Sequence, residues 1–172
     1  MKDKTIPPLP QGIILLIEDD VDDISLFRLA LAQSGSHCEV RAVEFAKDAI
    51  SYLGRMGEYA DEKQFPRPSL IVLDLSLPGM SGLEFLTWAK GEPPEKIPPI
   101  VVLTYSKLEL NRQLSEKLGA KGYFVKSPNL EETVLMTKNL LLNHANTYTA
   151  NSTATATSSS GTSEPSRRPC IH

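Results

Sequence analysis

The sequence is poor in cysteine, with only Cys38 and Cys170 among its 172 residues. A disulfide-stabilised scaffold or a cysteine-ligated zinc site needs more cysteines at closer spacing, so both are excluded. The chain is therefore expected to fold around an apolar core, for which its 41% of hydrophobic residues suffices. So few cysteines also favour a reducing cytoplasm.

The chain also lacks an excess of positive charge and long apolar runs. Its 18 basic and 21 acidic residues give a formal net charge of -3, so no overall basic character indicates a nucleic-acid partner. No run approaches the roughly 20 apolar residues that a membrane span needs, and the beginning, MKDKTIPPLPQG, lacks the apolar segment of a signal peptide. We predict a cytoplasmic protein with neither a nucleic-acid nor a membrane partner.

Large apolar side chains almost disappear from residue 146 onward, where the sequence reads NTYTANSTATATSSSGTSEPSRRP. Ordering such a segment costs more conformational entropy than its burial returns. We therefore predict a disordered tail rich in Ser, Thr and Ala over 146–172, a flexible N-terminus over 1–11, and one domain over 12–145.

Short, continuous apolar runs occur at 12–17 (GIILLI), 70–75 (LIVLDL) and 100–104 (IVVLT). Such runs are typical of strands that are buried on both faces of a parallel sheet. The segment 38–43 (CEVRAV) alternates apolar with polar residues, and 122–125 (GYFV) is short, which suits less buried edge strands. The sequence thus predicts five strands, three of them central.

Apolar residues recur at helical spacing in the segments between and after these strands. The repeats are Ile24, Phe27 and Leu31; Ala46, Ala49, Ile50 and Leu53; Leu83, Leu86 and Ala89; Leu110, Leu114 and Leu118; Leu130, Val134 and Leu141. Alternation of five strands with five helices predicts an α/β fold of three layers, with a parallel sheet covered on both faces. A ligand site in such a sheet lies at the carboxyl ends of the strands.

Polar residues follow the predicted strands at that edge: Glu18, Asp19 and Asp20; Asp74; Thr104 and Ser106; and Lys126. If the first and third strands are neighbours, about 4.8 Å apart, Asp19 and Asp74 repel each other unless a cation lies between them. Oxygen ligands without nearby His or Cys favour a hard ion, of which Mg²⁺ is the natural candidate. A single carboxylate beside a metal ion is suited to accept a phosphoryl group, so Asp74 is the candidate acceptor.

Four segments in this order, LLIEDD, DLSLPGMSG, VVLTYS and GYFVK, resemble the receiver domains of two-component response regulators. The resemblance covers about residues 12–144. It implies the flavodoxin-like receiver fold, with strand order 2-1-3-4-5. The segments YLGRMGEYADEKQFPRP and GEPPEKIPPI are similar to those of small standalone receivers that are found with phytochrome-like sensor kinases.

The resemblance implies a role for each matching residue of the metal site. Asp74 would be phosphorylated and would share Mg²⁺ with Asp19, which binds it directly, and with Glu18, which acts mainly through a bound water. The backbone carbonyl of Ser76 would supply a further oxygen ligand.

The resemblance also implies roles around the phosphoryl group. Thr104 would donate its hydroxyl to a phosphoryl oxygen, and Lys126 would pair with Asp74 before phosphorylation and with the phosphoryl group afterwards. In the conformational switch that is usual in the family, Thr104 would move toward the phosphoryl group and Tyr123 would follow it. Together the metal, the ammonium and the hydroxyl neutralise charge on the transferring group.

Two departures from the family pattern concern the surroundings of this site. Family members usually have Pro directly after the lysine, in a cis peptide, whereas here Ser127 follows Lys126. A cis bond before Ser127 would cost about 2.5 to 4 kcal/mol, so we expect either strain or a rebuilt loop. Tyr105 stands where a small residue is usual, and its ring could narrow the entrance to Asp74 or restrict inward rotation of Tyr123.

Three further acids at the start of the first helix, Asp20, Asp22 and Asp23, are interpreted as its cap and first-turn charges.

The predicted function is that of a single-domain response regulator. It accepts a phosphoryl group from a sensor histidine kinase, of phytochrome-like type, or from a phosphotransfer protein, and it signals by phosphorylation-dependent contacts with a downstream protein. The surface of the fourth helix, fifth strand and fifth helix is the predicted contact face and a candidate homodimer interface. Apart from assisting its own phosphoryl transfer and slow dephosphorylation, the chain is not expected to be an enzyme.

The sequence disfavours three alternative functions. A phosphatase that forms a phosphoaspartate needs a second acid two residues on, where Ser76 stands. A nucleotide- or flavin-binding protein needs a glycine-rich phosphate loop, where EDDVDD stands. A receiver-like scaffold that is never phosphorylated would need none of the site residues that are present.

Overall fold

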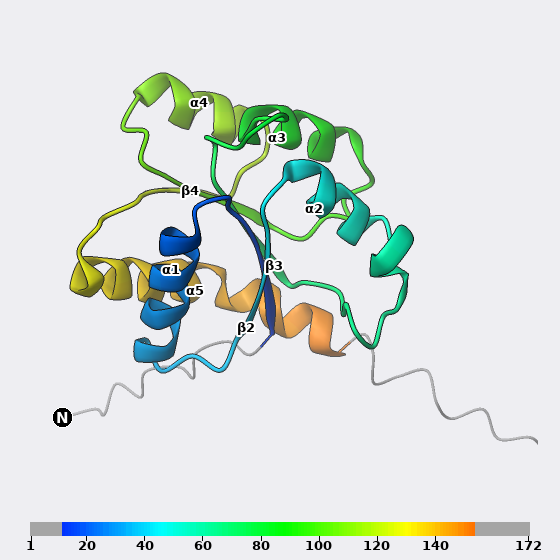
Figure 1. The fold of residues 1–172 in the computed structure, drawn as a ribbon, viewed down its shortest axis with the longest axis horizontal. Helices are drawn as coiled ribbons and strands as arrows, with labels where there is room; N and C mark the ends of the chain where they lie inside the picture. The colour runs from blue at the N-terminus through cyan, green and yellow to red at the C-terminus, as the bar shows by residue number, and fades with distance from the viewer. Residues whose placement is uncertain (1–11, 154–172) are drawn as a thin grey trace, which may run out of the picture.

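The computed structural model describes residues 12–153 and, of these, the side chains of 12–144. Its sheet has five strands: β1 (Ile13–Ile17), β2 (Glu39–Val43), β3 (Leu70–Leu73), β4 (Ile100–Thr104) and β5 (Gly122–Val125). All neighbouring strands are parallel, and their order is β2-β1-β3-β4-β5 (Figure 1). The predicted parallel sheet and strand order are confirmed.

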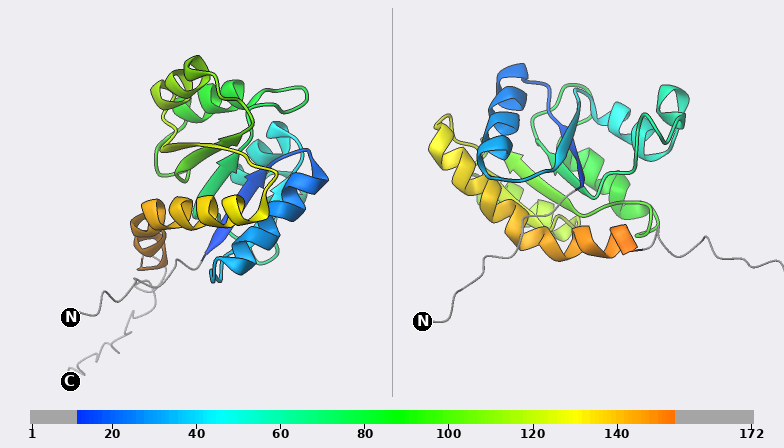
Figure 2. Two further views of the ribbon diagram at one scale, coloured as in Figure 1. Left: turned by 90° about the vertical axis from the view of Figure 1, so that its left-hand side faces the viewer. Right: turned by 90° about the horizontal axis from the view of Figure 1, so that it is seen from below.

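Five α-helices cover the two faces of this sheet: α1 (Val21–Gln33), α2 (Ala46–Leu53), α3 (Gly82–Gly91), α4 (Glu109–Lys117) and α5 (Leu130–Thr153). Figure 2 shows α1 and α5 together on one side of the sheet, with α2, α3 and α4 on the other. The predicted three-layer arrangement is therefore confirmed, and both faces of the sheet are buried.

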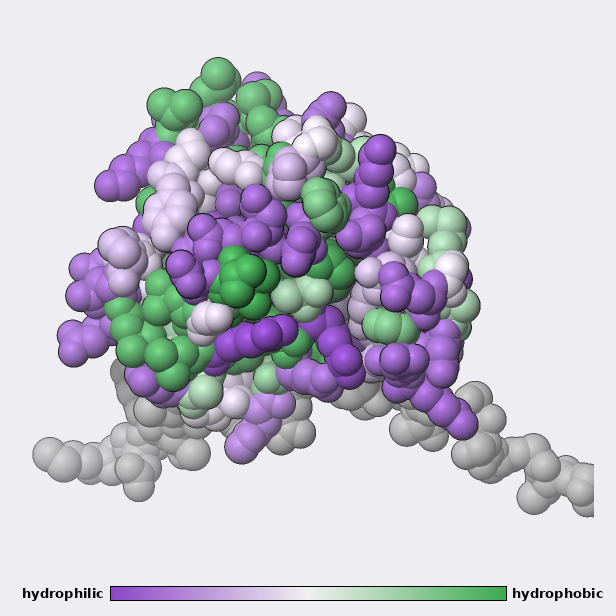
Figure 3. Space-filling view, in the orientation of Figure 1, coloured by the Kyte–Doolittle hydropathy of each residue, from purple (hydrophilic) through white to green (hydrophobic). Residues whose placement is uncertain are grey.

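The core explains why the central strands β1, β3 and β4 are almost wholly apolar. On β1, Ile14 and Leu16 pack toward α1 and α5, whereas Leu15 and Ile17 pack toward the other layer of helices. Because successive side chains of a strand point to opposite faces, a strand covered on both sides must be apolar throughout. Apolar residues also reach the surface over α1 and the start of α5, seen in green at the lower left of Figure 3.

The segment between α2 and β3 contains a 3-10 helix, η1 (Gly57–Ala60), which the sequence did not predict. Three aromatic rings hold this segment together, because Tyr52, Tyr59 and Phe65 pack with centroids 5.0 to 5.9 Å apart. The hydroxyl of Tyr52 also donates a hydrogen bond of 2.8 Å to the carbonyl of Pro66. The chain therefore enters β3 from a well-anchored loop.

Helix α5 continues through residues 146–153, which the sequence assigned to the tail. Extending a helix that is already formed requires no new nucleation, so a polar sequence can continue it for two turns. The rest of the predicted tail, 154–172, and the predicted flexible N-terminus, 1–11, lie outside the described residues. Among the residues that the structure does describe, no helix is long and apolar enough to cross a membrane.

Candidate functional site

The register of the sheet brings Glu18 and Asp74 together. Ile17 of β1 is paired with Leu73 of β3, so the residues that follow them lie side by side at the carboxyl edge. The backbone N–H of Asp74 donates to the carbonyl of Ile17 at 3.0 Å, which holds the two strand ends together. Glu18 is only 2% exposed and Asp74 only 5%. Two carboxylates are thus buried close together at this edge; the strand pattern predicted such proximity for Asp19 and Asp74.

Asp19 joins these two residues to form an acidic trio. Each of Glu18, Asp19 and Asp74 offers a carboxylate oxygen that lies within 4.8 Å of the others. Asp19 is exposed and forms the solvent side of the trio. Three carboxylate oxygens at this spacing suit a divalent cation, which prefers hard oxygen ligands. The predicted grouping of the three acids in space is confirmed.

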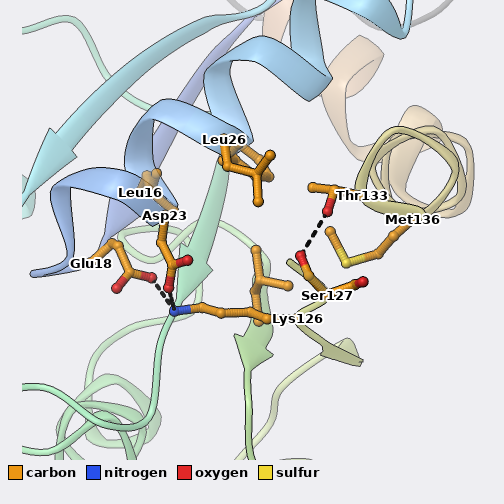
Figure 4. A pocket seen from close by; sticks show the side chains of 10 residues that line it. Leu16, Glu18, Asp23, Leu26, Lys126, Ser127, Thr133 and Met136 are labelled. Carbon is orange, nitrogen blue, oxygen red and sulfur yellow. Dashed lines mark hydrogen bonds and ion pairs between the residues drawn. The ribbon is translucent and has the colours of Figure 1, made fainter. Parts of the chain in front are cut away.

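Lys126 follows β5 and projects its ammonium among the carboxylates (Figure 4). Its Nζ lies 2.6 Å from Oε2 of Glu18, 2.8 Å from Oδ2 of Asp23 and 2.9 Å from Oδ2 of Asp74. An ammonium has three N–H donors, and here each has a carboxylate acceptor. The predicted contact between Lys126 and Asp74 is therefore present, within a larger ion-pair network.

This network shifts the pKa values of its most buried members. Burial raises the pKa of Glu18 from 4.5 to about 7, although its hydrogen bond with Lys126 opposes the shift. Burial lowers the pKa of Lys126, but hydrogen bonds to Asp23, Glu18 and Asp74 outweigh it and leave the pKa above its usual value. Lys126 is therefore a permanent cation, whereas Glu18 can take up a proton near neutral pH.

The three acids at the start of α1 have different roles. Asp20 is the N-cap, and its Oδ1 accepts hydrogen bonds from the backbone N–H groups of Asp22 (2.8 Å) and Asp23 (3.3 Å). The interpretation of Asp23 as only a first-turn charge is wrong, because its side chain contacts Lys126. Its position four residues before buried Phe27 was the available signal, since residues at i and i+4 share a helix face.

The end of β4 carries Thr104, which is fully buried. Its hydroxyl oxygen accepts a hydrogen bond of 3.4 Å from the backbone N–H of Ser106, at the start of the loop that leads to α4. Tyr105 between them is 51% exposed, and its hydroxyl donates to Oδ1 of Asp23 at 2.9 Å. This contact connects the loop with α1.

Tyr123 of β5 is buried, with 8% of its surface exposed. Its hydroxyl donates a hydrogen bond of 2.9 Å to the backbone carbonyl of Ser106, and the guanidinium of Arg112 lies 4.7 Å from its ring centroid. Tyr105 therefore does not prevent Tyr123 from occupying an inward position. Whether Tyr123 responds to phosphorylation stays a prediction.

The loop after Lys126 is rebuilt rather than strained, because the described residues contain no cis peptide bond. Ser127 donates its hydroxyl to Glu132 at 2.6 Å, and its carbonyl accepts from the hydroxyl of Thr133 at 3.0 Å. Both bonds join the loop to the first turns of α5. The site edge is thereby fixed on this side without a proline next to Lys126.

The loop after Asp74 is shaped by two glycines of the DLSLPGMSG segment. Gly79 has a φ of +74°, a conformation that side chains rarely adopt. Gly82 begins α3, and a Cβ there would lie 2.3 Å from the backbone oxygen of Asp74. The backbone N–H of Ser76 donates to Oδ1 of Asp74 at 3.2 Å. The carbonyl of Ser76 as a metal ligand stays a prediction.

Comparisons with known proteins show the family to which the chain is similar. A family model described as the response regulator receiver domain matches residues 14–138. The chain is 36% identical over 140 residues to response regulator Rcp1 of Synechocystis sp., an alignment that covers 81% of this chain and 91% of the relative.

Two solved structures are also similar. The phosphorylated cyanobacterial phytochrome response regulator RcpA has a TM-score of 0.68 at 38% identity, over 76% of this chain and 91% of its own. The Mn²⁺-bound form of response regulator Rcp1 has a TM-score of 0.66 at 36% identity, and the match covers 75% of this chain and 91% of the Rcp1 chain.

Proposed function

This chain belongs to the family of response regulator receiver domains, which signal through phosphorylation, and from this premise we propose that Asp74 is its phosphoryl acceptor. One observation carries the proposal: Asp74 is a member of the acidic trio and also lies 2.9 Å from the ammonium of Lys126. A phosphoryl group on Asp74 would therefore lie near two positive charges. One is the ammonium of Lys126, and the other is a cation bound by the trio. Such neutralisation is the main requirement for phosphoryl transfer, which needs little covalent assistance.

In the proposed reaction, the bond between the donor and phosphorus breaks as a bond forms from a carboxylate oxygen of Asp74 to phosphorus. Lys126 exchanges its hydrogen bond with Asp74 for one with a phosphoryl oxygen. Thr104 donates its hydroxyl hydrogen to a second phosphoryl oxygen. This hydrogen is available, because in the bond with Ser106 the hydroxyl oxygen of Thr104 accepts from the backbone N–H.

The ion proposed for the site is Mg²⁺, held by Glu18, Asp19, Asp74 and the backbone carbonyl of Ser76. The donor set supports this ion, because Mg²⁺ is bound in proteins by a few carboxylates, with waters and phosphate oxygens completing its octahedral shell. When bound, Mg²⁺ supplies positive charge to the transferring phosphoryl group. Few protein ligands also imply weak binding.

The proposed phosphodonor is a sensor histidine kinase or a phosphotransfer protein. The similarity to RcpA, whose name describes it as a phytochrome response regulator, supports a phytochrome-like kinase. The proposed output is contact with a protein target through α4, β5 and α5, a face that could also form a homodimer. Exposed Leu108 and Leu110 at the start of α4 support an apolar contact there. We propose a cytoplasmic signalling protein without an external substrate.

The test of Asp74 is phosphorylation by acetyl phosphate with Mg²⁺, followed by intact-mass measurement and peptide mapping. The parent chain should gain one phosphoryl group, and Asp74→Asn should gain none. Asp22→Asn is the matched control, because Asp22 is an exposed acid on α1 outside the trio. Labelling of Asp74→Asn at the parent's rate would contradict the assignment, and a parent that takes up no phosphoryl group would indicate an unphosphorylated scaffold.

The metal site is tested separately by following the melting temperature during titration with Mg²⁺. The parent should be stabilised at millimolar concentrations, on the order expected for a site with few protein ligands. Asp19→Ala should lose this stabilisation and Asp22→Ala should keep it. An unchanged response of Asp19→Ala would locate Mg²⁺ elsewhere.

A further inference from the structure

Asp23 lies at the site without belonging to the acidic trio or to the residues implied by the family resemblance. We propose that Asp23 is a positioning residue that holds the Lys126 ammonium beside Asp74, and that the hydroxyl of Tyr105 fixes Asp23 for this task. The inference rests on the proposed function, in which Lys126 binds the phosphoryl group on Asp74.

The distribution of acceptors around Lys126 supports a special role for Asp23. Of the three carboxylates that contact Nζ, Glu18 and Asp74 belong to the trio that suits a divalent cation, whereas Asp23 does not. A cation bound by the trio would repel the ammonium and compete for the same two carboxylates. Asp23 is then the partner that Lys126 can keep throughout the reaction.

The hydrogen bonds of Asp23 define its orientation. Oδ2 accepts from Lys126 at 2.8 Å, and Oδ1 accepts from the hydroxyl of Tyr105 at 2.9 Å. The ring of Tyr105 also lies 5.1 Å from Nζ, within the range of a cation–π interaction. Tyr105 therefore supports both members of the Asp23–Lys126 pair, from the loop that follows Thr104.

The hydrogen bonds of Ser127 join the loop after Lys126 to α5, and none of them reaches the ammonium. The direct contacts of the ammonium are with its three carboxylate acceptors. Figure 4 shows Asp23 and Glu18 reaching Nζ from the side on which α1 lies. Asp23 thus holds the ammonium directly from α1, whereas the loop after Lys126 is held to α5.

The first experiment uses metal-free protein and does not depend on phosphorylation. Ammonium protons of exposed lysines exchange rapidly with water, whereas those of a buried, fully paired ammonium exchange slowly. The parent should give a ¹H–¹⁵N signal for Nζ of Lys126, identified by its loss in Lys126→Arg. The signal should disappear in Asp23→Asn, weaken in Tyr105→Phe, and persist in the control Asp22→Asn.

The second experiment measures the rate of phosphorylation by acetyl phosphate in the presence of Mg²⁺. Asp23→Asn should react about tenfold more slowly, as expected when one charge-assisted hydrogen bond no longer aligns the ammonium. Tyr105→Phe should be slowed less, and Asp22→Asn should match the parent. Melting curves check that each variant is folded. If Asp23→Asn unfolds, Tyr105→Phe still tests the inference, because Tyr105 is exposed and its substitution disturbs the fold little.

An unchanged ammonium signal and an unchanged rate in Asp23→Asn would overturn the inference. If Tyr105→Phe shows the same ammonium signal and the same phosphorylation rate as the parent, Tyr105 does not fix Asp23, and that half of the inference is overturned. If no variant and no parent chain is phosphorylated, the proposed function fails, and the ammonium signal still decides whether Asp23 holds Lys126.

Discussion

Nζ of Lys126 lies 2.6 Å from Oε2 of Glu18, and these side chains are only 6% and 3% exposed. An ion pair so far from water gives little net stability relative to apolar residues, yet removing one partner is costly because the other is left as an unpaired buried charge. The two residues are 108 positions apart in the sequence, so their pairing also joins the end of β1 to the end of β5. The first two predictions follow from this pair.

Lys126→Met should lower the free energy of unfolding at neutral pH by about 3 kcal/mol, because the carboxylates of Glu18, Asp23 and Asp74 lose their shared cation. Urea denaturation without divalent ions measures the effect. Mg²⁺ should restore part of the loss, since it supplies positive charge to the same cluster. Lys47→Met, at an exposed position on α2, is the control, and an equal loss there would contradict the explanation.

Glu18 should make stability depend on pH. Its folded-state pKa of about 7 lies above the ordinary 4.5, so the folded chain binds more protons than the unfolded chain between these values. The contribution of Glu18 is most favourable below pH 4.5, and it should fall by about 3 kcal/mol as pH rises to 7. Denaturation at several pH values without divalent ions tests this, and Glu18→Gln should lack this component of the slope. A parallel pH dependence in the two proteins would refute it.

Gly82→Ala should be strongly destabilising, because the new Cβ would lie 2.3 Å from the backbone oxygen of Asp74 and 2.7 Å from Cα of Leu75. Backbone atoms cannot yield as flexible side chains can, so we expect a loss of about 2 to 3 kcal/mol. Phosphorylation should also slow, since Asp74 must shift. Gly91→Ala, at the other end of α3, meets no atom within 4 Å and should change stability by less than about 1 kcal/mol. Similar losses in both variants would contradict this account.

Ser76→Asn should shorten the lifetime of the phosphorylated form by roughly threefold or more, because an amide can orient water toward a phosphoryl group where a short hydroxyl cannot. Ser76 is exposed, and its backbone N–H donates a hydrogen bond to the carboxylate of Asp74. Decay of labelled protein after removal of the phosphodonor gives the lifetime, with Lys47→Ala as the control. Equal lifetimes would indicate that another group, such as Tyr105, controls the approach of water.

The sheet was predictable because burial on both faces requires an unbroken apolar run, as in residues 70–73 and 100–103. The site was predictable because parallel strands all end at one edge, where Asp74 and Lys126 follow β3 and β5. Family resemblance then assigned roles to residues that periodicity alone could only locate.

The parts that were missed depend on side-chain direction and on helix ends. The run EDDVDD does not state which acid turns inward, because Asp20, Asp22 and Asp23 are chemically alike and differ only in their place around α1. The continuation of α5 to Thr153 was missed because weak helix formers can extend a helix that an apolar face has already stabilised. The η1 turn depends on ring packing between Tyr52, Tyr59 and Phe65, which no periodic pattern encodes.

The sequence separations within the Lys126 network have a consequence for how the chain folds. Lys126 is 108 residues from Glu18 and 103 from Asp23, so these contacts close the longest loops at the site. During synthesis, Glu18, Asp23 and Asp74 emerge from the ribosome well before their shared cation exists. Long-range contacts are slow to form because the chain loses the entropy of loop closure before the contacts stabilise it. We therefore expect the acidic edge to be completed late in folding, so that competence to accept a phosphoryl group requires the fifth strand to be in place.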